Sequence, residues 1–198
     1  MSVDPASMHK PRRFVFVLLP QFSLLAFASA LEALRLANRT AQRDVYTWAL
    51  VGEGGGSVTC SAGTTFALDG DLPETHRDDT ILLCGGLAVQ HAASARLLGW
   101  LRREARSARA VGGLCTAAQV MAQAGLLDDR RATIHWENHD SFAEEFPEVD
   151  LSKAVYTIDG ARYTTAGGTA SIDLMLRLIA QDAEIGRASC RERVCHRV

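Results

Sequence analysis

The stretch Ala110-Val111-Gly112-Gly113-Leu114-Cys115-Thr116-Ala117-Ala118-Gln119-Val120 decides the fold of this chain. It reads as a short apolar strand, two glycines, a cysteine and the start of a helix. A nucleophile elbow has this composition, because its central residue sits on a sharp strand-to-helix turn where only small neighbours fit. The free N–H groups of the new helix are expected to lower the pKa of the Cys115 thiol. The alternative interpretation is a buried cysteine in a tight turn, without chemical function.

A second glycine turn lies upstream, where the apolar residues 81–84 run into Gly85-Gly86-Leu87. The carboxyl ends of parallel strands meet at one edge of a sheet, and ligands bind at that edge. We therefore expect this loop to lie beside Cys115. The backbone N–H groups of Gly86 and Leu87 are candidates for binding an anion or a carbonyl oxygen. For a glycine pair alone, close packing of a strand on a helix is the more common explanation.

A histidine and a tryptophan follow the next predicted strand, in Ala132-Thr133-Ile134-His135-Trp136-Glu137-Asn138. At a strand end, His135 can act as a base beside Cys115, although a lone histidine is more often only hydrogen-bonded in place. Trp136 forms either one wall of a pocket or part of the core.

A third glycine pair, Gly167-Gly168, separates a predicted strand from a helix that Thr169 is suited to cap. This segment closes the domain and is expected to line the same edge of the sheet. Here the structural interpretation is favoured over a chemical one.

Between the termini, predicted strands alternate with predicted helices, and several strands are continuous apolar runs typical of parallel strands covered on both faces. The turn Asp159-Gly160 indicates a hairpin near the end. The pattern predicts an α/β fold with an open, mostly parallel sheet and helices on both faces. The predicted strands are 13–19, 45–51, 80–84, 108–111, 131–135 and 154–158, with short pairs at 57–60 and 64–68. The predicted helices are 22–39, 88–105, 115–124, 138–146 and 169–182.

The composition is that of an ordinary globular chain of 198 residues, with 47% hydrophobic and 22% charged residues and a net charge of -2. It excludes a disordered chain and a disulfide-stapled miniprotein. A pI near 6.3 argues against a protein that coats nucleic acid. The five cysteines and the histidines show no zinc-ligand spacing, so we expect no metal and no cofactor. Free thiols favour the cytoplasm.

The two ends differ from the body of the chain. Residues 1–7 resemble a cloning remnant, with Met8 the expected native start. Residues 10–182 form the predicted domain. The segment 183–198 has no apolar period and is expected to be non-native or disordered, the alternative being a native basic tail. The uncharged run 14–31 also has features of a signal peptide, but a strand followed by an amphipathic helix explains more of it.

Taken together and in this order, the motifs resemble the ThiJ/PfpI superfamily, whose flavodoxin-like fold is shared with class I glutamine amidotransferases. They are more closely similar to the amidase-like N-terminal domain of AraC-type transcriptional regulators of the GlxA and ArgR-like groups. The resemblance covers residues 14–182. The motifs that carry it are Leu31-Glu32-Ala33-Leu34-Arg35-Leu36-Ala37-Asn38, Leu83-Cys84-Gly85-Gly86, Gly113-Leu114-Cys115-Thr116, Ala124-Gly125-Leu126-Leu127-Asp128, Arg131-Ala132-Thr133-Ile134-His135-Trp136 and Ala166-Gly167-Gly168-Thr169-Ala170-Ser171-Ile172-Asp173-Leu174-Met175-Leu176.

By this resemblance Cys115 takes the place of the nucleophile, His135 that of a nearby histidine, and Gly86 and Leu87 supply amides for an oxyanion. The family's enzymes and stress proteins also place a carboxylic acid just after the first strand. Here that region, 21–27, holds no acid. The late histidine and glutamate of the amidotransferases are absent from 167–173 as well.

Without its acid the cysteine lacks a proton-transfer partner, a contribution typically worth a factor of about 10²–10⁴. The resemblance therefore implies a non-catalytic sensor of a small amino-acid-like or betaine-like metabolite. The expected ligand-binding residues are Gly86, Leu87, Cys115, Thr116, His135 and Trp136.

The same resemblance implies a homodimer that binds DNA through a helix-turn-helix module beyond Asp182. We expect no membrane association. One alternative is a cysteine-dependent hydrolase or hydratase that uses Cys115 and His135. The other is a redox-sensing stress protein, which the missing acid disfavours.

Overall fold

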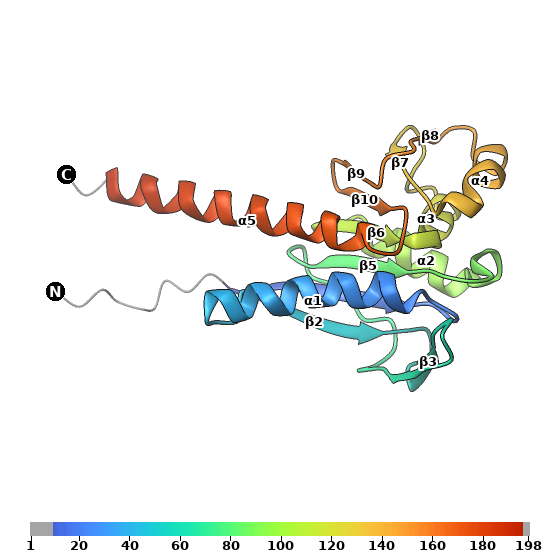
Figure 1. Cartoon of the computed structure of the whole chain (residues 1–198), viewed down its shortest axis with the longest axis horizontal. Coiled ribbons are helices and arrows are strands. Elements are labelled where there is room, and N and C mark those ends of the chain that lie inside the picture. The colour runs from blue at the N-terminus through green and yellow to red at the C-terminus, as the bar shows by residue number, and fades with distance from the viewer. Residues whose placement is uncertain (1–9, 196–198) are drawn as a thin grey trace.

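Across residues 10–195, which the computed structural model describes with side chains up to residue 184, a six-stranded sheet forms the centre of the molecule (Figure 1). The strand order is β2-β1-β5-β6-β10-β9, in which β9 is antiparallel to β10 and the other pairs are parallel. The strands are β1 (Arg12–Leu18), β2 (Tyr46–Val51), β5 (Thr80–Cys84), β6 (Ala110–Leu114), β9 (Tyr156–Asp159) and β10 (Arg162–Thr165).

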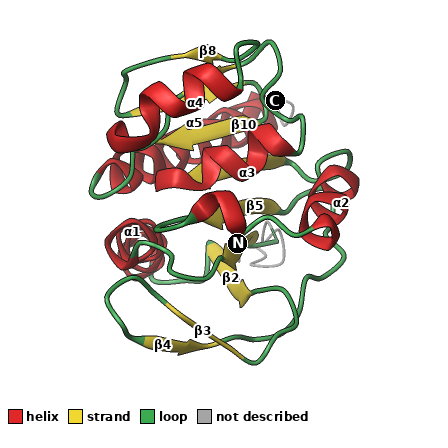
Figure 2. Ribbon diagram, turned by 90° about the vertical axis from the view of Figure 1, so that its right-hand side faces the viewer, coloured by secondary structure: helices red, strands yellow, loops and turns green. Residues whose placement is uncertain are grey.

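Helices cover both faces of this sheet, and Figure 2 shows α1 and α2 on opposite sides of it. α5 runs beside α1 and projects past the other elements (Figure 1). The helices are α1 (Leu24–Ala41), α2 (Ala95–Glu104), α3 (Ala118–Gln123), α4 (His139–Glu145) and α5 (Ala170–Cys195). In the described part of the chain, none of them is long and apolar enough to cross a bilayer.

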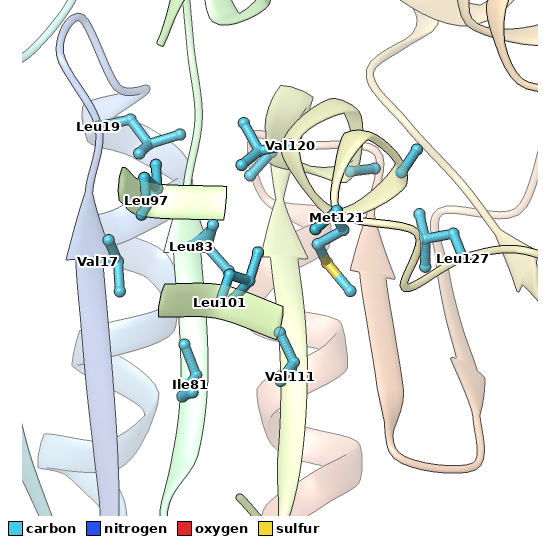
Figure 3. Packing of buried hydrophobic residues seen from close by; sticks show 14 of the residues in the cluster. Val17, Leu19, Ile81, Leu83, Leu97, Leu101, Val111, Val120, Met121 and Leu127 are labelled. Atoms are coloured by element: carbon cyan, nitrogen blue, oxygen red, sulfur yellow. The ribbon is translucent and has the colours of Figure 1, made fainter. Parts of the chain in front are cut away.

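Two hydrophobic clusters form the core, one on each face of the sheet. Alternate residues of β1 enter different clusters, because successive side chains of a strand point to opposite faces. Phe16 packs edge-on against Phe27 of α1 on one face. On the other face, Val17 lies near Leu83 and Leu101 (Figure 3). Such burial on both faces explains the uninterrupted apolar run of β1.

Short elements connect this framework. Three 3₁₀ turns precede or begin helices, and two small sheets lie outside the central one. These are η1 (Val89–His91), η2 (Cys115–Ala117), η3 (Trp136–Asn138), the pair β3 (Ser57–Thr59) with β4 (Thr65–Ala67), and the pair β7 (Arg131–Ala132) with β8 (Asp150–Leu151).

The predicted α/β architecture and the terminal hairpin are confirmed. The strand expected at 131–135 is wrong beyond Ala132, because the Thr133 N–H donates to the Thr164 hydroxyl at 2.7 Å instead of continuing a ladder. The helix expected from residue 88 begins only at Ala95, and the strand expected at 108–111 lies at Ala110–Leu114.

Two predictions concern the ends of the chain. The last helix does not stop near Asp182, where the sequence predicts its end, but continues to Cys195. That residues 183–198 are a non-native or disordered tail stays a prediction. The expected remnant at residues 1–7 and the start at Met8 lie outside the described residues.

Asp182 ties α5 to the amino-terminal edge of the sheet. Its carboxylate accepts hydrogen bonds from Arg12 Nη1 at 2.8 Å and from the Tyr46 hydroxyl at 3.2 Å. Arg109 Nη2 approaches the second oxygen at 3.4 Å. Burial, followed by the charge of Asp182, raises the pKa of Tyr46. A single carboxylate of α5 is therefore joined to β1, to β2 and to the residue that precedes β6.

Replacing Asp182 by alanine is expected to lower the free energy of unfolding by about 2 kcal/mol, because Arg12 and Tyr46 are left partly buried without their acceptor. Urea unfolding followed by circular dichroism measures the change. The matched control is Asp44→Ala at an exposed position, expected to change stability by less than about 0.5 kcal/mol. Equal effects of the two substitutions would contradict the role given to Asp182.

Candidate functional site

Cys115 sits where β6 turns sharply into η2 and α3. Its backbone has a φ of 62°, in the left-handed region that non-glycine residues rarely adopt. Cys115 is only 6% exposed. A strained backbone of this kind costs on the order of 1–3 kcal/mol and persists where the surroundings fix it.

The surroundings that fix Cys115 come from the end of β10, the loop that follows it and the start of α5. The Cys115 N–H donates to Thr165 Oγ1 at 3.3 Å, and Thr165 Oγ1 lies 3.3 Å from Ser171 Oγ. Gly167, with a φ of 86°, lies so close that a Cβ there would be 2.8 Å from the Cys115 sulfur. Gly167 of the third glycine pair therefore packs directly against Cys115, at the sheet edge where this segment was expected.

The glycine loop after β5 lies on the other side of Cys115. Thr116 Oγ1 donates to the Gly86 carbonyl at 2.8 Å and joins the two loops. Of the two expected free amides, that of Leu87 is occupied, because it donates to the Gln21 carbonyl at 3.0 Å. Among the described residues, the Gly86 N–H has no hydrogen-bond acceptor. One amide, not two, is thus available to a ligand.

A cavity of about 360 Å³ opens between these loops. Five of the six residues predicted to bind a ligand line it: Gly86, Leu87, Cys115, Thr116 and His135. Residues that the sequence reasoning did not select also line it, among them Ser23, Ser61, Gln90, Glu137 and Asn138.

His135 reaches this cavity from a different element than predicted. It does not end a strand, since β7 stops at Ala132, but directly precedes η3. Its Nδ1 lies 3.6 Å from Glu137 Oε2. Cys115, His135 and Glu137 thus line one cavity, a thiol, an imidazole and a carboxylate together.

Trp136 is not among the residues that line this cavity. Its side chain is 74% exposed, and its ring lies 5.8 Å from that of His135. It lines a second cavity on the other side of the segment 133–140. The indole was expected beside Cys115, but the η3 turn directs consecutive side chains to different cavities.

The thiol of Cys115 is held in its neutral form. Burial raises its pKa to about 11, and the negative charge of Glu137 acts in the same direction. The Thr116 N–H and the Ser23 hydroxyl favour the thiolate, but they offset only part of the effect of burial. The N–H of Thr116 lowers the pKa as predicted, but the net shift is upward because burial, which the local sequence does not show, has the larger effect.

Ser23 occupies the region where related enzymes carry an acid. Its hydroxyl caps α1 by accepting from the Ala26 N–H at 3.4 Å, and it also lies within hydrogen-bonding reach of the Cys115 sulfur. A serine directly before a helical run is an N-cap signal, so its location could have been found from the sequence. Its reach to Cys115 could not.

Within the described residues, no three histidine, cysteine, aspartate or glutamate side chains come together as a metal site would require. The cavity instead offers one free amide, several hydroxyl and amide groups, an imidazole and a carboxylate around a neutral thiol. This arrangement is suited to binding a small polar molecule, because convergent polar groups in a pocket fix the orientation of a ligand.

Comparison with known proteins gives consistent results. The model of the DJ-1/PfpI family matches residues 12–181. The HTH-type transcriptional regulator CdhR of Pseudomonas aeruginosa is 45% identical over 168 residues, which are 85% of this chain and 50% of that protein. The HTH-type transcriptional regulator GbdR of the same species is 35% identical over 178 residues, 90% of this chain and 48% of that protein. The chain thus spans about half the length of these relatives. A solved AraC family transcriptional regulator from Pseudomonas putida superposes with a TM-score of 0.77 at 28% identity, covering 86% of this chain and 92% of that one.

Proposed function

The chain belongs to the DJ-1/PfpI family, and from this premise we propose that it is the small-molecule-sensing part of an AraC-type transcriptional regulator. The relatives named as HTH-type regulators support this proposal, because the chain is similar to them over about half their length. In such a regulator DNA would be bound by a helix-turn-helix module outside the matched region.

The single observation that carries a binding role rather than a catalytic one is the neutral, buried thiol in the cavity. Cys115 is 6% exposed, and its pKa is raised to about 11. A thiolate is the nucleophile in cysteine catalysis, so a thiol with this pKa is poorly suited to attack a substrate at neutral pH. The cavity around it still provides hydrogen-bonding groups.

The ligand class that we propose is a small amino-acid-like or betaine-like metabolite. The free Gly86 N–H is suited to one carboxylate oxygen of the ligand. The Glu137 carboxylate, 62% exposed at the rim, is suited to its cationic end. Glu137 thereby takes the role that the sequence had suggested for Trp136.

A member of this class is expected to raise the melting temperature of the protein. At a concentration of about 100 times its Kd, a ligand stabilises the native state by about 2.7 kcal/mol, which corresponds to roughly 5–10 °C for a chain of this size. Differential scanning fluorimetry with glycine betaine and the twenty common amino acids measures the shift. The substitution His135→Ala, which removes a side chain from the cavity wall, should weaken binding about tenfold.

The control for this experiment is His76→Ala, at an exposed histidine that does not line the cavity. It should leave the shift in melting temperature unchanged. The proposal fails if no compound in the panel stabilises the protein, or if both variants respond to the best compound like the unmodified chain.

We further propose that the protein is a cytoplasmic homodimer. Exposed leucines on the adjacent helices α1 and α5, Leu25 and Leu176, support an association between copies. The buried free thiols of Cys60, Cys84 and Cys115 suit a reducing compartment. Sedimentation equilibrium tests the oligomeric state.

A cysteine-dependent hydrolase or hydratase is the second candidate. The observation that favours it is that Cys115, His135 and Glu137 line the same cavity, since a thiol, an imidazole and a carboxylate are the groups that cysteine catalysis uses. The raised pKa of Cys115 opposes it. The reactivity of this thiol decides between the two candidates, as argued in the Discussion.

A further inference from the structure

A second cavity, of about 310 Å³, lies beside the first. Residues of the segment 133–140 line both cavities. His135, Glu137 and Asn138 of this segment line the first cavity. The other residues of the segment 133–140 line the second cavity, together with two residues from elsewhere in the chain. The residues of the second cavity are Thr133, Ile134, Trp136, His139, Asp140, Lys153 and Ala166. Its volume is in the range of small-molecule sites.

Four side chains of this cavity have unused binding capacity. The Trp136 indole is 74% exposed. His139 Nε2 is buried and has no hydrogen-bond partner. Among the described residues, neither the Lys153 ammonium nor the Asp140 carboxylate has an ion-pair or side-chain hydrogen-bond partner. In the described part of the chain, an aromatic face, a cation and an anion without side-chain partners therefore line one cavity, next to a histidine whose Nε2 is buried and unpaired.

Hydrogen bonds hold the backbone on both sides of Lys153. The Ser152 N–H donates to the Ala132 carbonyl at 2.8 Å, and the Thr133 hydroxyl donates to the Ala154 carbonyl at 2.8 Å. The Ala166 N–H donates to the Val155 carbonyl at 2.9 Å. The wall that carries the cation is thus fixed before any ligand arrives, which lowers the entropy cost of binding.

We propose that this second cavity binds a small zwitterion of the α-amino acid class that carries an aromatic or apolar side group. The ligand carboxylate pairs with Lys153, and its ammonium pairs with Asp140. The side group packs on the Trp136 indole, where aromatic rings stack favourably. The His139 ring forms part of the cavity wall beside them. Opposite charges on one small cavity favour a molecule that carries both charges over one that carries either alone.

The lysine content of the chain makes this proposal directly testable. Its lysines are Lys10, which is exposed, and Lys153. Reductive methylation with ¹³C-formaldehyde keeps the positive charge and places one NMR-visible dimethylamine on each, besides the α-amine. The variant Lys153→Arg assigns the Lys153 signal by removing it while keeping the charge, and Lys10 is the internal control.

L-Phenylalanine is the probe. It should shift the Lys153 signal in a saturable way and leave the Lys10 signal in place. Hydrocinnamate, which lacks the ammonium, and phenethylamine, which lacks the carboxylate, should each require at least about tenfold higher concentrations. Asp140→Asn should weaken phenylalanine binding at least about fivefold while changing hydrocinnamate binding less than about twofold. Trp136→Ala should weaken binding of all three compounds.

Three results would overturn the proposal. The first is the absence of a saturable Lys153 shift at up to about 20 mM phenylalanine, a range that covers weak sites. The second is an equal shift of both lysines. The third is a Lys153 signal that depends on protein concentration and not on the probe, which would show that a second copy of the chain covers the indole. The variant His135→Ala separates this proposal from the function of the first cavity, because it should weaken ligands there and leave the Lys153 response intact.

Discussion

Iodoacetamide is expected to alkylate Cys115 in the folded protein about a hundredfold more slowly, at about pH 7, than it alkylates the same cysteine in the urea-unfolded chain. The reagent reacts with the thiolate, and each unit of pKa above the working pH removes a factor of about ten from the thiolate fraction. Burial places the pKa of Cys115 at about 11, from an ordinary value of 9.0. Peptide mapping by mass spectrometry follows Cys115 separately from the other cysteines.

The pH dependence of this reaction carries the same information. In the folded protein the rate should rise about tenfold per pH unit up to about pH 10, since the thiol stays mostly protonated below its pKa of about 11. In the unfolded chain the rate should level off only above about pH 10, because half of the thiol is ionised at its ordinary pKa of 9.0 and about nine-tenths one pH unit higher.

Two variants serve as matched controls, because they should change the alkylation rate of Cys115 in opposite directions. Glu137→Gln removes a negative charge that disfavours the thiolate and should speed alkylation, whereas Ser23→Ala removes a hydrogen bond that favours it and should slow alkylation. Both changes should stay within about tenfold, because Glu137 is 62% exposed and solvent screens its charge. Fast alkylation of the folded protein at about pH 6 would instead demonstrate a thiolate and support the hydrolase or hydratase.

Gly86→Ala is expected to lower the free energy of unfolding by about 3 kcal/mol or more. A Cβ on Gly86 would lie 1.9 Å from the Gln21 carbonyl oxygen and 2.8 Å from the backbone of Phe22. Backbone atoms cannot rotate out of the way as a side chain can, so the two loops must separate. That separation would also disturb the hydrogen bond from Thr116 to the Gly86 carbonyl. Equilibrium unfolding in urea measures the loss.

The matched control is Gly99→Ala, in the exposed interior of α2, where an added Cβ meets no atom within 4 Å. This substitution should stabilise the protein by about 0.5–1 kcal/mol, because alanine is the better helix former. The same chemical change should therefore have opposite effects at the two positions. A stable Gly86→Ala protein would mean that the loops after β1 and β5 do not touch as described.

Most of the architecture could be predicted from the sequence. The continuous apolar runs of β1, β5 and β6 are typical of parallel strands, whose side chains are buried on both faces of the sheet. The errors occurred where tertiary contacts override local pattern. Thr133 leaves its strand because a hydroxyl from β10 satisfies its N–H, and periodicity carries no trace of that bond. The helix after residue 88 is delayed to Ala95, where Ser94 caps it.

The sequence predicted the part of the candidate site that lies at the ends of β5 and β6, but not the residues that other loops contribute. Gly86, Cys115 and Thr116 could be placed because strand ends in a parallel sheet share one edge. The reach of Ser23 to Cys115 could not be predicted, since it depends on how the loop after β1 packs, and Glu137 was missed because the η3 turn directs its side chain, and not that of Trp136, to this cavity. The direction of the Cys115 pKa was missed for a related reason. The effect of neighbouring N–H groups can be anticipated from the local sequence, whereas burial depends on everything that packs around the sulfur.

The crossed order of the strands has a consequence for the chain as it leaves the ribosome. β2 can pair with β1 once Val51 has emerged, but the opposite edge of β1 stays open until β5, which ends at Cys84, has been made. Cys115 is enclosed later still, because Thr165, which accepts from the Cys115 N–H, is synthesised 50 residues after it. In a nascent chain that stalls after Cys115 and before Thr165, the strands β1, β2 and β5 have all been made, but Cys115 is not yet covered. Chaperones and oxidants can reach Cys115 during that interval of translation, before the completed fold encloses it.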